Sequence, residues 1–217
     1  MMASGRRLAV LLLFAGVPVT GAAAEIVPFD GTWKEQGFLR LFSNEYVQNG
    51  RSVDVVSDGT VSLLWRPVEG ARSDSTRASW VWNVTEGVIP TDLTRKGGDD
   101  RNLAVYFVFV DADRATALDG KNARRVLREE SAKAIIYVWG GDQPVGARLP
   151  SPYSPRLRTQ VLQTTTTGRF RETVDVAEDY RTLFGSEPGA LVGLAISADS
   201  DDTRGRIVAS VSDLALN

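Results

Sequence analysis

The sequence predicts an all-β protein, a jelly-roll-like two-sheet sandwich with one inserted surface helix. Short apolar runs follow one another along the chain and are separated by turn residues. Several runs alternate polar and apolar residues with period two, which is typical of strands with one buried face. The segment 121–131 instead places apolar residues at helical spacing, and it bridges two of the expected strands. Because many short strands with turns between them are typical of sandwiches, we expect about ten strands in two sheets.

The first 24 residues are expected to be a secretory signal peptide. Two arginines precede an apolar run at 8–17, and Ala22 and Ala24 form an A-x-A cleavage pattern. The run is too short to span a membrane. We therefore expect residues 25–217 to form a single β-sandwich domain that is exported to the periplasm or outside the cell.

The expected strands are distributed over the rest of the chain. They are 51–57, 60–67, 76–84, 103–110, 133–140, 157–163, 171–177, 190–198 and 206–216. The first two flank Asp58-Gly59, a dipeptide that predicts a tight hairpin turn. The strand 103–110 is apolar at every position, so we expect it to be central and covered on both faces.

Two further segments complete the expected architecture. Residues 177–185 predict one or two helical turns that end at Gly185, with acidic residues near the start. The proline-rich segment 148–156 is expected to be a loop, because closely spaced prolines cannot join the interior of a sheet.

The composition excludes several classes of function. The chain has no histidine, which excludes histidine zinc sites, Ser-His-Asp and Cys-His catalysis, and histidine acid–base chemistry. It has no cysteine, so no disulfide can stabilise the exported domain. We find no basic patch that would indicate a nucleic-acid partner and no second apolar run of membrane-spanning length. Carboxylate, lysine, tyrosine or serine chemistry and oxygen-ligated cations remain.

Aromatic residues on three expected strands are the first candidate site. If they lie on one exposed face, their rings could stack on sugars while Arg101 bonds to sugar hydroxyls. Alternatively they fill the core between the sheets, as large rings in sandwiches often do, and Arg101 forms a salt bridge with Asp99 or Asp201. The aromatic candidates are Trp80, Trp82, Tyr106, Tyr137 and Trp139.

Acidic residues at two strand ends are the second candidate site. Asp99 and Asp100 precede a central strand, while Asp199, Asp201 and Asp202 follow another. Together they could bind Ca²⁺, which takes oxygen ligands, and no other cofactor is indicated. The simpler interpretation is a solvated turn in which aspartates accept bonds from backbone N–H groups.

The order of several segments resembles the uncharacterised bacterial family termed domain of unknown function 3047. The matching segments are WVWNV (80–84), GGDDRNLAVYFVF (97–109), IIYVWGG (135–141), DYRTLFGSEPG (179–189), GLAISADSDDTRG (193–205) and ASVSDLAL (209–216). The resemblance implies a fold and an envelope location, and it implies no reaction. The family pattern carries an arginine where this chain has Ala104, so a role of that arginine does not transfer. More distantly, the layout is similar to jelly-roll carbohydrate-binding modules.

Three functions follow as hypotheses. The first is a non-catalytic module that binds a glycan or another envelope polymer. The second is a carboxylate-based polysaccharide hydrolase or lyase, which would require two acids facing each other in a cleft, one of them with a raised pKa. The third is an envelope structural protein without a small-molecule site.

Overall fold

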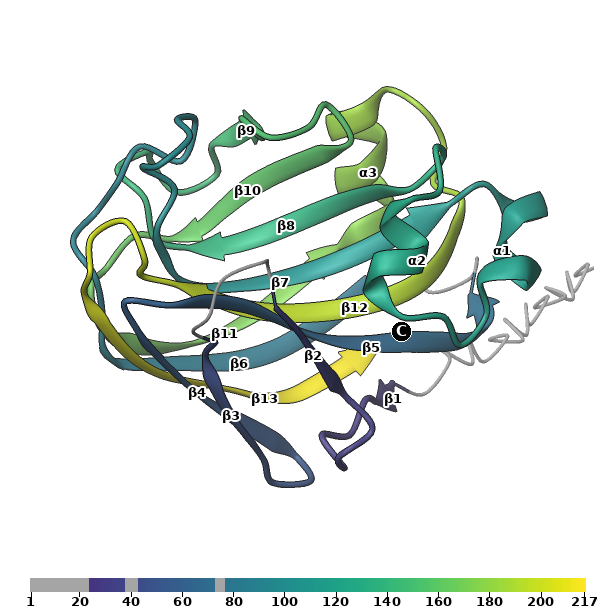
Figure 1. Ribbon diagram of the computed structural model, residues 1–217. Helices are drawn as coiled ribbons and strands as arrows, with labels where there is room; N and C mark the ends of the chain where they lie inside the picture. The colour runs from purple at the N-terminus through teal and green to yellow at the C-terminus, as the bar shows by residue number, and fades with distance from the viewer. Residues whose placement is uncertain (1–23, 38–42, 73–76) are drawn as a thin grey trace, which may run out of the picture.

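The computed structural model describes residues 24–37, 43–72 and 77–217, and it confirms the all-β, jelly-roll-like sandwich of two sheets (Figure 1). Apart from Ala24, the expected signal peptide lies outside the described residues. No helix in the described part of the chain is long and apolar enough to cross a membrane.

The two sheets are built from strands that are far apart in the sequence. One sheet has six strands, in the order β11 (Gly168–Asp175), β6 (Arg77–Glu86), β13 (Arg206–Leu216), β4 (Ser52–Asp58) and β3 (Glu45–Gln48), with β1 (Glu25–Ile26) paired to β13. The other has seven, in the order β2 (Lys34–Gly37), β5 (Val61–Arg72), β12 (Ala190–Asp199), β7 (Arg101–Val110), β8 (Lys133–Trp139), β10 (Leu157–Gln163) and β9 (Arg148–Pro150). Only the β8–β10 pair is parallel among the described strands.

All nine expected strands are present. The prediction of a central, doubly covered strand is also confirmed, because β7 lies between β12 and β8. The strands that the sequence did not indicate are β1, β2, β3 and β9. Each has four residues or fewer, which is too short for a period-two pattern to be recognised. The strand β9 begins the segment expected to be a loop, and its proline is tolerated because β9 is an edge strand.

The predicted hairpin at Asp58-Gly59 is wrong. β4 pairs with β13 in one sheet, whereas β5 pairs with β12 in the other, so this turn carries the chain between sheets. The turn is held by the neighbouring connection from β12 to β13. Ser57 Oγ lies 2.8 Å from Ser200 Oγ, and Gly59 donates its N–H to the carbonyl of Gly205 at 3.0 Å. Two crossings between the sheets therefore lie side by side.

Three short helices interrupt the strands. The helix expected at 121–131 is shorter, because α2 (Ala123–Leu127) ends at Leu127, and α1 (Ala112–Leu118) precedes it. Residues 119–122 separate the two helices, and Asn122 caps α2 by accepting a hydrogen bond from the Arg125 N–H. The expected short helix near 177–185 is α3 (Val176–Phe184), and it ends at Gly185 in the left-handed conformation.

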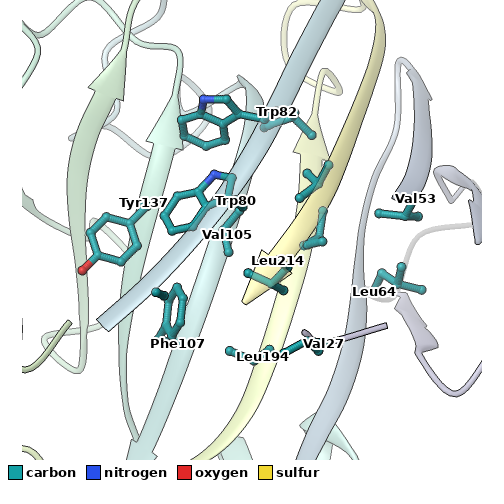
Figure 2. Close-up of a cluster of buried hydrophobic side chains, with 14 of the residues drawn as sticks. Val27, Val53, Leu64, Trp80, Trp82, Val105, Phe107, Tyr137, Leu194 and Leu214 are labelled. Atoms are coloured by element: carbon teal, nitrogen blue, oxygen red, sulfur yellow. The ribbon is translucent and has the colours of Figure 1, made fainter. Parts of the chain in front are cut away.

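A cluster of aromatic rings forms the centre of the core between the sheets (Figure 2). Trp80 and Trp82 of β6 face Tyr137 and Trp139 of β8, and all four residues are 0% exposed. The ring centroids of Trp80 and Tyr137 lie 5.6 Å apart, as do those of Trp82 and Trp139. Period-two alternation on each strand places these rings inward. The ligand-stacking role considered for them is therefore corrected, since none reaches the surface, and they pack the core.

Candidate functional site: a cavity on the outer face of the seven-stranded sheet

The seven-stranded sheet carries a cavity of about 460 Å³ on the face that points away from the core. Alternate residues of four adjacent strands form its floor, because the residues between them point into the core. These floor residues are Val61, Leu63 and Trp65 of β5, Ala195 of β12, Tyr106 and Val108 of β7, and Ala134, Ile136 and Val138 of β8. Because the side chains of Ala134 and Ala195 are short, they leave open space above the sheet at these positions.

Two small apolar clusters on this face flank the cavity. One packs beneath α1 and α2 around Trp65 and Val126, and the other lies around Leu93 and Val138. Leu127, at the end of α2, and the segment from Ser151 to Tyr153 also line the cavity. The hollow is therefore apolar along most of its length and is covered by loops and a helix end.

A buried arginine forms the polar end of the cavity. Arg101 begins β7, and its side chain is only 13% exposed. Its Nη1 donates to the Asp99 carbonyl at 2.8 Å and to Asp199 Oδ2 at 3.1 Å. Its Nη2 donates to the Tyr106 hydroxyl at 2.8 Å, which in turn lies 3.0 Å from Ser197 Oγ. The guanidinium is thus fixed by β7, by β12 and by the preceding loop.

Asp199 is the most unusual group in this end of the cavity. Its side chain is 10% exposed, and its Oδ1 is buried without a hydrogen-bond partner among the described residues. Burial raises the pKa of Asp199 to about 8, against the attraction of Arg101, and the carboxylates of Asp201, Asp100 and Asp99 act in the same direction as burial. Asp199 therefore holds a proton over much of the neutral pH range, and it lines the cavity.

Tyr153 joins the loop after β9 to the acidic end. The residue is 56% exposed, and its hydroxyl donates to Asp99 Oδ1 at 2.7 Å. Partial burial and the Asp99 carboxylate raise the pKa of Tyr153 to about 12, so the phenol stays a hydrogen-bond donor at neutral pH. The ammonium of Lys96 lies 5.7 Å from the centre of the ring. Tyr153 is the exposed aromatic ring of the cavity wall.

The five acids expected at two strand ends divide into two groups. Asp99 and Asp199 contact Arg101, whereas Asp100, Asp201 and Asp202 place carboxylate oxygens within 4.8 Å of one another. Both oxygens of Asp100 accept backbone N–H groups, from Asp202 at 3.3 Å and from Thr203 at 2.7 Å. Asp100 therefore anchors the turn after β12. Three carboxylates are fewer ligands than the six to eight that Ca²⁺ takes, so backbone or water oxygens would have to complete a calcium site.

The sequence located part of this site. Arg101 and Tyr106 were expected near a ligand, and they do line the cavity and bond to each other. Tyr153 and the aliphatic floor were missed. Alternation along 133–140 could have indicated an apolar outer face, but every residue from Ala134 to Trp139 is apolar, so no alternation is visible. No local signal places Tyr153 beside Asp99, because the two are 54 residues apart.

Comparison with known proteins concerns the family and the fold. The family described as protein of unknown function DUF3047 matches residues 31–215. The chain is similar in fold to the xyloglucanase domain of NopAA from Sinorhizobium fredii, at 10% identity and TM-score 0.46, covering 85% of this chain and 92% of that one. It is also similar to the family 11 xylanase from Neocallimastix patriciarum, at 14% identity and TM-score 0.46, covering 90% of this chain and 94% of that one. No curated protein sequence matches. At such identities the likeness describes the course of the chain alone, and no residue role is transferred.

Proposed function

Because the chain belongs to the DUF3047 family, which is described only as being of unknown function, we propose its function from its own cavity: a non-catalytic protein that binds a ligand on the outer face of the seven-stranded sheet. The single observation that carries this proposal is the combination of an apolar hollow with a preformed polar end. Arg101 and Asp199 are held there by neighbouring strands before any ligand arrives.

The dimensions and chemistry of the cavity support binding. Ligand pockets commonly enclose roughly 300–1,000 Å³ and combine apolar walls with a few convergent polar groups. The cavity of about 460 Å³ has both features. Its polar groups are oriented by each other, because Tyr106 and Asp199 both bond to Arg101. A ligand would therefore meet a site that needs little rearrangement, which reduces the entropic cost of binding.

The proposal includes export and an envelope ligand. The leader expected at residues 1–24 supports export to the periplasm or beyond, where residues 25–217 act as one domain. A segment of glycan or of another envelope polymer is the ligand class that we propose there. The exposed ring of Tyr153, next to Asp99, offers one face for stacking and one acceptor for hydroxyls.

A binding screen tests this function. The mature chain is screened by thermal shift against glycans and amphiphiles, with and without Ca²⁺, and each hit is measured by calorimetry. A ligand of the cavity raises the unfolding temperature, and its affinity falls when Ala134→Leu fills the floor. Asp54→Asn, on the exposed face of the other sheet, is the matched control and leaves the affinity unchanged. A ligand that binds both variants equally contradicts the cavity as the site.

A second candidate function is carboxylate-based cleavage of a polysaccharide. Asp99 and Asp199 both reach Nη1 of Arg101, and Asp199 carries the raised pKa. A protonated acid beside a second carboxylate is the arrangement that glycosidases use. This candidate is tested by the release of reducing ends from polysaccharides. Cleavage by the unchanged chain that disappears in Asp199→Asn supports it, and no cleavage of any substrate by a chain that binds them contradicts it.

A further inference from the structure

Resting on the proposed binding function, we propose that the ligand is an amphiphile whose apolar body lies on the cavity floor and whose amine head reaches Asp199. The proposal keeps the cavity as the binding site and names an amphiphile, in place of a bare glycan chain, as its ligand. Two independent features of the cavity carry it, the composition of its floor and the unused acceptor at its polar end.

The floor is mostly aliphatic along the sheet, with the aromatic rings of Trp65 and Tyr106 at two of its positions. Its central residues are Val61, Leu63, Val108, Ile136, Val138 and Ala195. None of these side chains can donate or accept a hydrogen bond. A sugar hydroxyl placed on them would lose its bonds to water and gain none, which opposes binding. A hydrocarbon chain gains from leaving water and needs no polar partner. The floor therefore favours an apolar ligand body over a bare sugar chain.

The polar end lacks a donor for one carboxylate oxygen. Within the described part of the chain, Asp199 Oδ1 is buried without a partner, while Oδ2 already accepts from Arg101. The Nη atoms of Arg101 are occupied by Asp99, Asp199 and Tyr106, whereas its Nε is buried without an acceptor among the described residues. When Asp199 is ionised this oxygen only accepts, so the missing partner must donate, and a cationic donor beside it also favours the ionised form. A ligand group that donates at this position completes the bonding of a side chain that is nine-tenths buried.

The charges around the cavity favour a cationic donor. Among the described residues that line it, Arg101 is the one cation, and the acids are Asp99, Asp199, Asp201 and Asp202. An ammonium head is attracted by the ionised carboxylates of Asp99 and Asp199 at this end, whereas a carboxylate or phosphate head is repelled by them. Charge-assisted hydrogen bonds to a carboxylate are also stronger than those from a neutral hydroxyl.

The strand register fixes the direction in which the ligand lies. Asp199 is paired with Arg101 at the start of β7, and Ala195 is paired with Tyr106. Farther along, Val108 is paired with Ala134, on the side of the cavity where the end of α2 contributes Leu127. The amine head therefore lies at the β12–β7 end, and the apolar body extends toward Ala134 and α2.

Three probes with one shared chain and different heads test the proposal. Octylamine, 1-octanol and octanoate are titrated into the mature chain at about pH 9, above the pKa of about 8 of Asp199 and below that of an alkylammonium, and their affinities are measured by calorimetry. We expect octylamine to bind at least about tenfold more tightly than 1-octanol, and octanoate to bind most weakly. In Asp199→Asn we expect octylamine to bind no more than about threefold more tightly than 1-octanol, while the affinity for 1-octanol stays almost unchanged.

Matched variants distinguish the contribution of the ligand's amine head to the affinity from that of its apolar body. Ala134→Leu weakens both octylamine and 1-octanol, because it fills the floor that they share, whereas Asp54→Asn changes neither. If Asp199→Asn does not fold, Asp99→Asn serves in its place, because it removes a second charge at the same end. Circular dichroism of each variant establishes that it is folded before titration.

The outcomes distinguish this inference from the proposed function. Equal affinities for the three octyl probes, or tighter binding of octanoate, overturn the amine head. A neutral oligosaccharide that binds wild type but not Ala134→Leu, together with no binding of octyl probes, overturns the amphiphile and leaves the binding function standing. If no glycan and no octyl probe binds, both proposals are overturned.

Discussion

Arg101 Nη1 donates to Asp199 Oδ2 across 3.1 Å, and this bond joins the first residue of β7 to the last residue of β12. The same guanidinium reaches Tyr106 farther along β7. One side chain thus holds together the acidic end of the cavity, so changes to its partners should affect both stability and binding.

Asp199 should make the stability of the protein depend on pH. Its pKa is about 8 in the folded protein, against about 4 in an unfolded chain. Between these values the folded state binds the extra proton, so the free energy of unfolding falls as the pH rises through this window. We expect a loss on the order of a few kcal/mol from this group between about pH 5 and pH 9. Urea denaturation at a series of pH values measures it.

The control for this prediction is Asp199→Asn, which carries no titrating proton. The variant should show a flatter dependence of stability on pH than the wild type over the same window. A wild-type stability that rises with pH between about 5 and 8, and does so less in the variant, contradicts the raised pKa of Asp199.

Tyr106 should matter more to stability than Tyr153, although both hydroxyls bond to a charged group. Tyr106→Phe leaves a buried Nη2 of Arg101 without its 2.8 Å acceptor, which should cost about 1–3 kcal/mol. Tyr153→Phe removes a hydrogen bond from a residue that is 56% exposed, so it should cost about 1 kcal/mol or less. Chemical denaturation compares the two variants directly. A larger loss in Tyr153→Phe would contradict the burial of the Arg101 network.

The tryptophans of β6 should stabilise the core without contributing to binding. Trp82 Nε1 donates to Glu172 at 3.1 Å, whereas Trp80 Nε1 is buried without a partner among the described residues. Trp80→Phe therefore loses packing alone, while Trp82→Phe also loses a hydrogen bond. We expect Trp82→Phe to cost about 1 kcal/mol more than Trp80→Phe. Denaturation curves give this difference, and an affinity for any cavity ligand that falls in either folded variant would contradict the core role.

Features of the fold were predicted correctly where they are determined by residues that are neighbours in the sequence. Alternation in 76–84 placed Trp80 and Trp82 on one face, and the uniformly apolar run 103–110 indicated a central strand. The prediction of a hairpin at Asp58-Gly59 is wrong because a turn dipeptide specifies a local bend. It does not specify which sheet the next strand joins.

Part of the candidate site was predictable, because the acids at the ends of two strands were expected together and oxygens of Asp100, Asp201 and Asp202 do lie within 4.8 Å of one another. Asp99 and Asp100, directly before Arg101, could be recognised as a pair of acids, and Tyr106 lies five residues after Arg101 on the same strand. Arg101, the ion-pair partner of Asp199, is 98 residues away from it in the sequence. The lack of a partner for its Oδ1 is a property of packing, and composition does not encode it.

Gly193 should control the shape of the cavity floor. The indole ring of Trp65, from the neighbouring strand β5, lies directly over Gly193, where a Cβ would occupy the same space. Gly193→Ala should therefore displace Trp65, whose Nε1 donates to the Lys121 carbonyl at 3.1 Å beside α2. We expect a loss of about 1–3 kcal/mol from this overpacking, together with weaker binding of any cavity ligand.

The double variant Gly193→Ala with Trp65→Leu distinguishes this steric cause from a backbone effect. The smaller leucine leaves room for the new methyl group, so the loss from Gly193→Ala should be smaller in the Trp65→Leu background than in the wild type. A thermodynamic cycle from denaturation of the four proteins gives the coupling free energy. Additive losses would show that Trp65 does not oppose a side chain at position 193, and the floor would then not depend on this contact.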